Sequence, residues 1–188
     1  LYCLVQVLNS EGVFFMGATL QTIRERRSVK SYKPDMIPEE TLQKIVEAGT
    51  WAPSGMGRQS AIIVAVTNKE LRDRLSRMNA KIMGTDIDPF YGAPVVLIVL
   101  ADKTVPTHVY DGALVMENLM LAAQDLGIGS CWIHRAKEEF ESEEGKEILK
   151  SLGIEGDYEG IGHCILGYPA KEPKKAADRK ASYIYYAR

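Results

Sequence analysis

The sequence has few of the features that mark several large classes of protein. Its three cysteines, Cys3, Cys131 and Cys164, form no CxxC pair, so we expect no disulfide framework and infer a reducing compartment, the cytoplasm. The 23 Lys and Arg side chains nearly balance the 25 Asp and Glu side chains, for a formal net charge of −2. The chain therefore has no overall attraction for nucleic acid or for an anionic membrane, and we expect neither as a partner.

Long apolar runs and metal-binding motifs are also missing. Residues 1–15 are apolar but interrupted at Asn9, Ser10 and Glu11, and they are too short and lack the basic leader needed for a membrane anchor or signal peptide. Because Met16 offers an alternative start, we treat residues 1–15 as a leader or extension and residues 16–188 as a single domain. The three histidines, at 108, 134 and 163, lack the spacing of metal ligands, so no metal site is predicted.

What remains is typical of an ordinary globular domain of mixed α/β composition. Hydrophobic residues make up 46% and charged residues 26% of the 188 positions, enough for one substantial core. Apolar periodicity and Gly or Pro boundaries predict strands over 61–67, 95–101, 128–134 and 161–168, and helices from Thr19, from Pro38, over 69–83, 109–126 and 142–152. The 109–126 helix is apolar on nearly every face, which predicts burial on more than one side, in a core or at a dimer interface.

Four segments contain residue types that can bind a ligand. Residues 26–30 (Arg-Arg-Ser-Val-Lys) could grip a phosphate or could be a solvated helix end. Residues 51–59 form a Gly-rich loop that could wrap a planar ligand or simply join a helix to a strand. Residues 126–135 run from a helix end into a strand whose polar end favours a ligand. Residues 168–180 are basic and follow the last strand.

The order and spacing of these segments resemble the FMN-dependent nitroreductase family over about residues 18–180. The resemblance implies that Arg26, Arg27, Ser28, Lys30 and Arg179 hold the FMN phosphate. A second family motif matches Ala52, Pro53, Ser54, Gly55 and Gln59. A third, Leu-Gly-Ile-Gly-Ser-x-Trp-Ile, implies that the segment Trp132, Ile133, His134 and Arg135 presents backbone donors to the flavin ring.

The sequence departs from the second motif at two positions. Gly57 stands where the family has asparagine, and Ser60 stands where a proline commonly follows the glutamine. The side-chain contact that the family asparagine makes to the flavin is therefore not expected here.

The resemblance also implies an architecture and an activity. The architecture is a mixed central sheet flanked by helices, in an interlocked homodimer with FMN at the interface, where residues 53–59 reach the flavin of the partner subunit. The activity is hydride transfer from NADH or NADPH through flavin N5 to a nitroaromatic, a quinone or a similar small acceptor, with no catalytic side chain. A specialised flavin reductase, such as a dehalogenase or a flavin-cleaving enzyme, and a non-catalytic FMN-storage protein stay open as alternatives. In the specialised case, Phe90 and Tyr91 of the 83–92 segment could stack on a substrate or anchor the loop.

Overall fold

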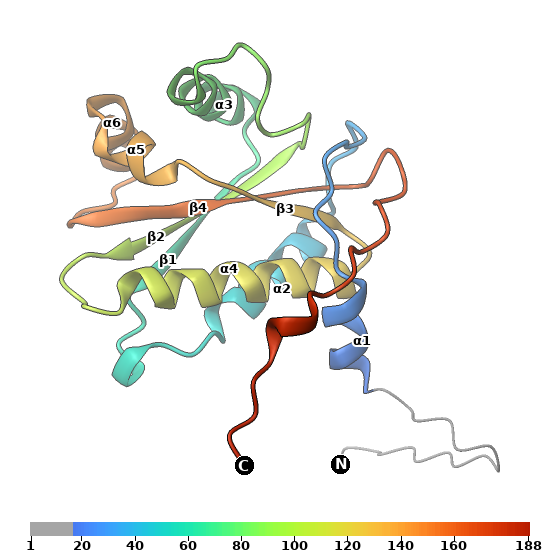
Figure 1. Cartoon of the computed structure of the whole chain (residues 1–188). Coiled ribbons are helices and arrows are strands. Elements are labelled where there is room, and N and C mark those ends of the chain that lie inside the picture. The colour runs from blue at the N-terminus through green and yellow to red at the C-terminus, as the bar shows by residue number, and fades with distance from the viewer. Residues whose placement is uncertain (1–16) are drawn as a thin grey trace.

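The computed structural model of the protein describes residues 17–188, so the predictions about residues 1–15 and the alternative start at Met16 fall outside the described residues. One four-stranded sheet with the order β1-β2-β4-β3 runs through the molecule (Figure 1). The elements are α1 (Ala18–Glu25), α2 (Glu39–Thr50), η1 (Gly55–Gly57), β1 (Ala61–Val66), α3 (Lys69–Met83), β2 (Val95–Asp102), α4 (His108–Asp125), β3 (Gly129–Ile133), α5 (Ala136–Glu141), α6 (Glu143–Ser151), β4 (Tyr158–Gly167) and η2 (Ala181–Tyr183).

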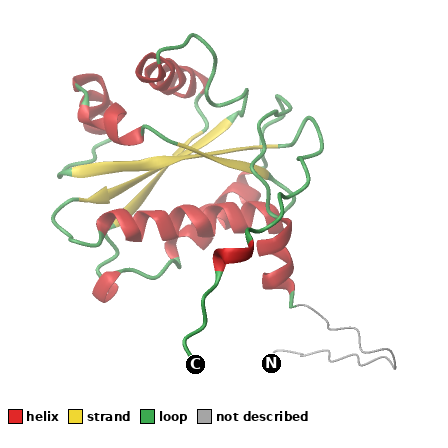
Figure 2. Cartoon of the chain, viewed as in Figure 1, coloured by secondary structure: helices red, strands yellow, loops and turns green. Residues whose placement is uncertain are grey.

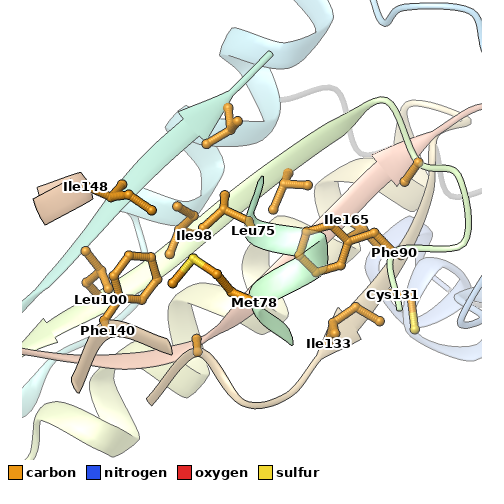
Figure 3. Packing of buried hydrophobic residues seen from close by; sticks show 14 of the residues in the cluster. Leu75, Met78, Phe90, Ile98, Leu100, Cys131, Ile133, Phe140, Ile148 and Ile165 are labelled. Carbon is orange, nitrogen blue, oxygen red and sulfur yellow. The ribbon is translucent and has the colours of Figure 1, made fainter. Parts of the chain in front are cut away.

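Helices cover both faces of the sheet, as Figure 2 shows. Side chains of β2 alternate between the two faces, as the pleat requires. Val96, Ile98 and Leu100 pack toward α3, α5 and α6, where Figure 3 shows Leu75, Phe140 and Ile148 around them. The intervening residues of β2, from Val95 to Ala101, pack toward α2 and α4. A central strand buried on both faces explains why this stretch is apolar without interruption.

The mixed α and β fold class is confirmed, and the predicted strands all form. The strand directions are more uniform than a mixed sheet implies, because β1–β2, β2–β4 and β3–β4 are each antiparallel. Among the described residues, the one parallel pairing is an isolated bridge between Ser28 and Ser130.

One local prediction was wrong and one element was missed. The first helix was predicted to begin with Thr19 as its cap, but α1 begins at Ala18 and Gly17 is its N-cap. The short helix α5 was not predicted, because its six residues are too few to show a helical period.

Among the described residues, other elements cover one side of α4. Val115, Met116, Leu119 and Ala123 pack against the sheet and α2, whereas Val109, Tyr110 and Leu114 are exposed. The second buried side that the sequence predicts is therefore not provided by residues 17–188.

The segment after α1 runs along the open edge of β3. The Val29 N–H donates to the Ser130 carbonyl at 2.9 Å, and the Lys33 N–H donates to the Tyr168 carbonyl at 2.9 Å. Figure 1 shows this blue segment beside the orange-red chain that follows β4. Residues from both ends of the domain thus meet at one sheet edge.

Within residues 17–188, none of the helices combines the length and the apolar character that crossing a membrane requires.

Candidate functional site

A cavity of about 430 Å³, here called the basic cavity, opens where the two ends of the domain meet. It is lined by Arg27, Ser28, Val29, Lys30, Ser31, Lys171, Glu172, Pro173 and Lys174. Four of these side chains carry a positive charge and one a negative charge, so the cavity suits an anion. Two of the four segments singled out in the sequence, 26–30 and 168–180, are brought together here.

The cationic side chains that line the basic cavity differ in whether they are already bound to other groups of the protein. Nη1 of Arg27 donates to the carbonyl oxygens of Arg24 and Arg26 at 2.6 and 2.7 Å, so this guanidinium satisfies carbonyl groups at the end of α1. Lys30 is exposed, and its ammonium lies 5.8 Å from the centre of the Tyr91 ring. These bonds favour the helix-end interpretation for Arg27, whose part in phosphate binding stays a prediction, and Lys30 is well placed to meet a ligand.

A second cavity of about 350 Å³, here called the edge cavity, adjoins the first and shares Ser28 and Lys30 with it. Its lining is completed by Met83, Ile87, Asp88, Pro89, Tyr91, Cys131, Trp132, Ile133, His134 and Arg135. The structure thus brings all four predicted ring-binding residues, 132–135, to the same cavity as Ser28 and Lys30. Their part in binding stays a prediction.

The open edge of β3 gives the edge cavity a wall of backbone. The Ser130 carbonyl points away from β4, because it accepts from the Val29 N–H. In an antiparallel strand every second residue faces the same neighbour, so the N–H and C=O of Trp132 also face the open edge. The Trp132 indole lies across β4 at Gly162, where a Cβ would come within 2.2 Å of Nε1. Hence the backbone of Trp132 is what the edge offers to a ligand.

Cys131 lines the edge cavity as a neutral thiol. Burial raises the pKa of this thiol, and the opposing effects of a hydrogen bond with Ser28 and of the charges on Lys30 and Arg26 are smaller. A thiol that stays protonated is a poor nucleophile, so we assign Cys131 no nucleophilic role. The charge on the half-buried Arg26 also acts on this pKa, but Arg26 is not among the residues that line the cavity.

The segment 83–92 forms the apolar wall of the edge cavity, and Asp88 holds it in place. The Asp88 carboxylate accepts from Arg72 and Ser76 at 2.6 Å each and from the Phe90 and Gly92 N–H groups. Burial acts to raise the pKa of Asp88, but these bonds outweigh it and the pKa lies below its ordinary value. Phe90 is fully buried, so it cannot stack on a substrate and is a loop anchor. Tyr91, 38% exposed, is the residue of this pair that faces the cavity.

The loop 53–59 lies elsewhere, against a third cavity of about 340 Å³ that Pro53, Ser54 and Gln59 line. Asp111 of α4 is buried and anchors this loop, accepting from the Gly55 N–H at 2.9 Å and from the Ser60 hydroxyl at 2.6 Å. Ser60, which replaces the family proline, thus supplies a hydroxyl for that anchor.

The third cavity lies at the opposite sheet edge from the first two. The loop 53–59 leads into β1, and the order β1-β2-β4-β3 places β1 and β3 at opposite edges. Strands lie about 4.8 Å apart, so these edges are separated by roughly 14 Å. Within one chain, the loop 53–59 does not join the site formed by Ser28, Lys30 and 132–135. Arg179 is exposed and lines neither the basic cavity nor the edge cavity.

Sequence reasoning missed several residues of this site. Met83, at the end of α3, and Ile87, in the following loop, line the edge cavity; they belong to the segment 83–92, in which only Phe90 and Tyr91 were singled out. Asp111 lies in a helix that was singled out only for its apolar character. Lys171 and Lys174 had a signal, because they belong to the basic segment 168–180.

The chain is similar to known proteins in both sequence and fold. A nitroreductase from Bacteroides fragilis, solved with bound FMN, superposes with a TM-score of 0.84 at 32% identity, over 92% of this chain and 100% of that one. A nitroreductase with bound FMN from Desulfitobacterium hafniense gives a TM-score of 0.81 at 29% identity, over 93% and 100% of the two chains. A putative NADH dehydrogenase/NAD(P)H nitroreductase from Archaeoglobus fulgidus is 30% identical over 84% of this chain and 88% of its own length. The sequence profile of the nitroreductase family matches residues 23–86 and 86–168, so the chain belongs to the nitroreductase family.

Proposed function

We propose that the protein is an FMN-dependent oxidoreductase that takes electrons from NADH or NADPH and passes them to a small acceptor such as a nitroaromatic or a quinone. The observation that carries the proposal is the pair of adjoining cavities that share Ser28 and Lys30. One is basic and the other has a backbone edge, which together suit a phosphorylated molecule with a planar, hydrogen-bonding ring. Family relatives solved with bound FMN support this choice of ligand.

The basic cavity fits the phosphate of FMN. Lys30, Lys171 and Lys174 converge on it from two segments, and Ser28 adds a hydroxyl. Charge-assisted hydrogen bonds from such groups are the strong contacts that phosphate sites use. Arg26 and Arg179, the other predicted phosphate ligands, stay predictions.

The edge cavity fits the ring. The outward N–H and C=O of Trp132 offer a donor and an acceptor, and Met83, Ile87 and Tyr91 supply an apolar surface over which a ring can lie. Lys30 and Arg135 bring positive charge to the edge cavity, and this charge would stabilise negative charge on a bound ring. Bound FMN would supply the hydride and electron chemistry. The protein then needs to bind, orient and exclude water, and we assign it no acid–base residue.

We propose further that the site is completed in a homodimer. The loop 53–59 lies at the sheet edge opposite to β3, so only a second copy can bring its Pro53, Ser54, Gly55 and Gln59 to the same ligand. Large apolar side chains near this loop are open: Trp51, Met56 and Tyr110 are 78%, 81% and 73% exposed. Exposure of this kind is typical of an interface.

The setting proposed from the sequence is the cytoplasm. Cys131 and Cys164 are free and buried in the described part of the chain, as a reducing compartment permits. Residues 16–188 are proposed to form one domain.

The proposal is tested on freshly purified protein. We expect a yellow protein that releases FMN, rather than FAD, on denaturation, and whose flavin absorbance is bleached by NADH or NADPH in anaerobic stopped-flow. A yellow protein that neither coenzyme reduces would support a storage role instead. A colourless protein that takes up no FMN when it is supplied would refute the proposal.

A further inference from the structure

A fully buried polar cluster lies behind the edge cavity and has no part in the function proposed above. Asn79 of α3, Glu139 of α5 and His163 of β4 each have 0% exposure. His163 Nε2 lies 3.0 Å from Glu139 Oε1, and Asn79 Nδ2 donates to the same carboxylate oxygen. The rings of Phe90 and Phe140 pack around His163, with centroids 5.2 and 6.2 Å away. The cluster is therefore enclosed by apolar groups.

Asn79 connects this cluster to the wall of the edge cavity. Its Nδ2 donates to the His134 carbonyl at 2.8 Å, and its Oδ1 accepts from Arg135 Nε at 3.0 Å. The Asn79 side chain thus binds the main chain of His134 and the guanidinium of Arg135. Both residues line the edge cavity.

The turn that Asn79 holds is one the chain would not adopt without support. Arg135 has a φ of 80°, in the left-handed region that residues other than glycine seldom occupy. This conformation turns the chain from β3 into α5 and directs the Arg135 side chain to Asn79 and Met83. Such strain persists only where the surroundings hold it, and it is found chiefly at functional sites.

The remaining contacts fix the orientation of the Asn79 amide. Its two N–H bonds are used by the His134 carbonyl and the Glu139 carboxylate, so a reversed amide would set oxygen against two acceptors. The bond from His163 holds Glu139 in turn.

The cluster is poorly suited to a purely structural role. In the described part of the chain, Glu139 Oε2 and His163 Nδ1 are buried and have no hydrogen-bond partner. Buried polar atoms of this kind are destabilising, and apolar side chains of the same volume are commonly tolerated as well or better. We therefore expect the cluster to contribute to function rather than to the stability of the fold.

We propose that Asn79 is a positioning residue which, held by Glu139 and His163, sets the His134–Arg135 turn against the flavin and thereby favours the reduced form of the bound cofactor. The inference rests on the proposed function. It concerns the residues behind the site and is independent of which acceptor the enzyme uses.

The test compares variants in two measurements: the midpoint potential of bound FMN, and hydrogen exchange of the 134–136 amides in FMN-free protein. Asn79→Leu keeps the branched shape of the side chain and removes the three bonds. We expect at least tenfold faster exchange and a tenfold loss of preference for reduced over oxidised FMN, which for two electrons lowers the potential by about 30 mV. His163→Leu should act in the same direction, whereas His163→Gln, which keeps an N–H for Glu139, should restore most of both values.

Asn118→Leu is the matched control, because Asn118 is a half-buried asparagine that donates to the Ala48 carbonyl at 3.1 Å in the other helix layer. It should leave both measurements unchanged. Wild-type potentials in Asn79→Leu and His163→Leu would overturn the inference, even with faster exchange, because Asn79 would then be structural only. If Asn79→Leu does not fold, the comparison of His163→Leu with His163→Gln tests the inference. A wild type that binds no FMN would refute the proposed function. The exchange rates would then test only whether Asn79 holds the His134–Arg135 turn.

Discussion

At the scale of single residues, neighbouring cations have different tasks. Arg27 and Lys30 belong to one short basic segment, yet Arg27 is bound to the carbonyl groups of Arg24 and Arg26 while Lys30 stands between two cavities. The sequence grouped them as one phosphate site because spacing along the chain does not show which carbonyl groups lie nearby. The structure therefore selects Lys30 for the first mutational test.

Replacing Lys30 should weaken FMN binding strongly. Loss of one charge-assisted hydrogen bond costs roughly 1.5–3 kcal/mol, so Lys30→Ala is expected to lower FMN affinity by about one to two decades. Flavin fluorescence titration measures the change. Lys44→Ala removes an exposed lysine that pairs with Glu40 on α2 and should bind FMN as the wild type does.

Arg26 and Arg179 are the predicted phosphate ligands that line neither cavity. If they hold the phosphate, Arg26→Ala and Arg179→Ala should each reduce FMN affinity by about one to two decades in the same titration. Unchanged affinity in both variants would leave the phosphate to Lys30 and the lysines of the segment 168–180.

At the scale of elements, the loop between α2 and β1 is held from a distance. Asp111 of α4 lies more than 50 positions along the chain and accepts from Gly55, Ser60 and Thr107. Burial acts to raise the pKa of Asp111, but the bonds from Ser60, Gly55 and Thr107 outweigh it, so the pKa lies below its ordinary value. The loop conformation thus depends on an ionised carboxylate.

Acid should release this anchor. A carboxyl group whose pKa is lowered by folding stabilises the protein fully above its unfolded pKa of about 3.9, and that contribution is lost as the pH falls below this value. Asp111→Asn should therefore unfold more easily at neutral pH, by about 1.5–3 kcal/mol, and should lose less further stability between about pH 4 and pH 2. Urea unfolding at several pH values measures both effects. Asp35→Asn, at an exposed aspartate, should follow the wild-type curve; a parallel curve for Asp111→Asn would contradict the prediction.

At the scale of the whole molecule, the segments 53–59 and 132–135, which the sequence predicts to bind one ligand, lie at opposite edges of the sheet. The apolar side chains left open on α4, on the loop after α2 and at the C-terminal end, among them Tyr110, Met56 and Tyr185, lie outside both cores. A second copy would account for both observations.

A charge on the exposed side of α4 should separate the subunits. The wild type is expected to sediment at twice the chain mass of 20.9 kDa, and Tyr110→Glu should shift it toward the monomer and reduce FMN retention, because the proposed site needs both copies. Leu152→Glu is the matched control, since Leu152 is an exposed apolar residue beyond α6, in the opposite helix layer. A monomeric wild type that retains FMN would exclude the composite site.

Local chemistry determined much of this protein from the sequence. The β-branched runs fixed β1 and β2, the helical spacing of Leu71, Leu75 and Met78 fixed α3, and the motif order indicated the family, because each depends on residues close together in the chain. The short helix α5 was not predicted, since six residues are too few to show the apolar period of a helix.

Only the tertiary structure decided how distant residues meet. The sequence left Asn79, Asp111 and Glu139 without a role, and it left Phe90 open between a stacking residue and a loop anchor; the structure buries all four. It also placed 53–59 away from 132–135. Strand order and buried hydrogen bonds bring together positions that are far apart in the chain. Which positions meet depends on the free energy of burying their side chains and pairing their polar groups, and both arise only when the core packs.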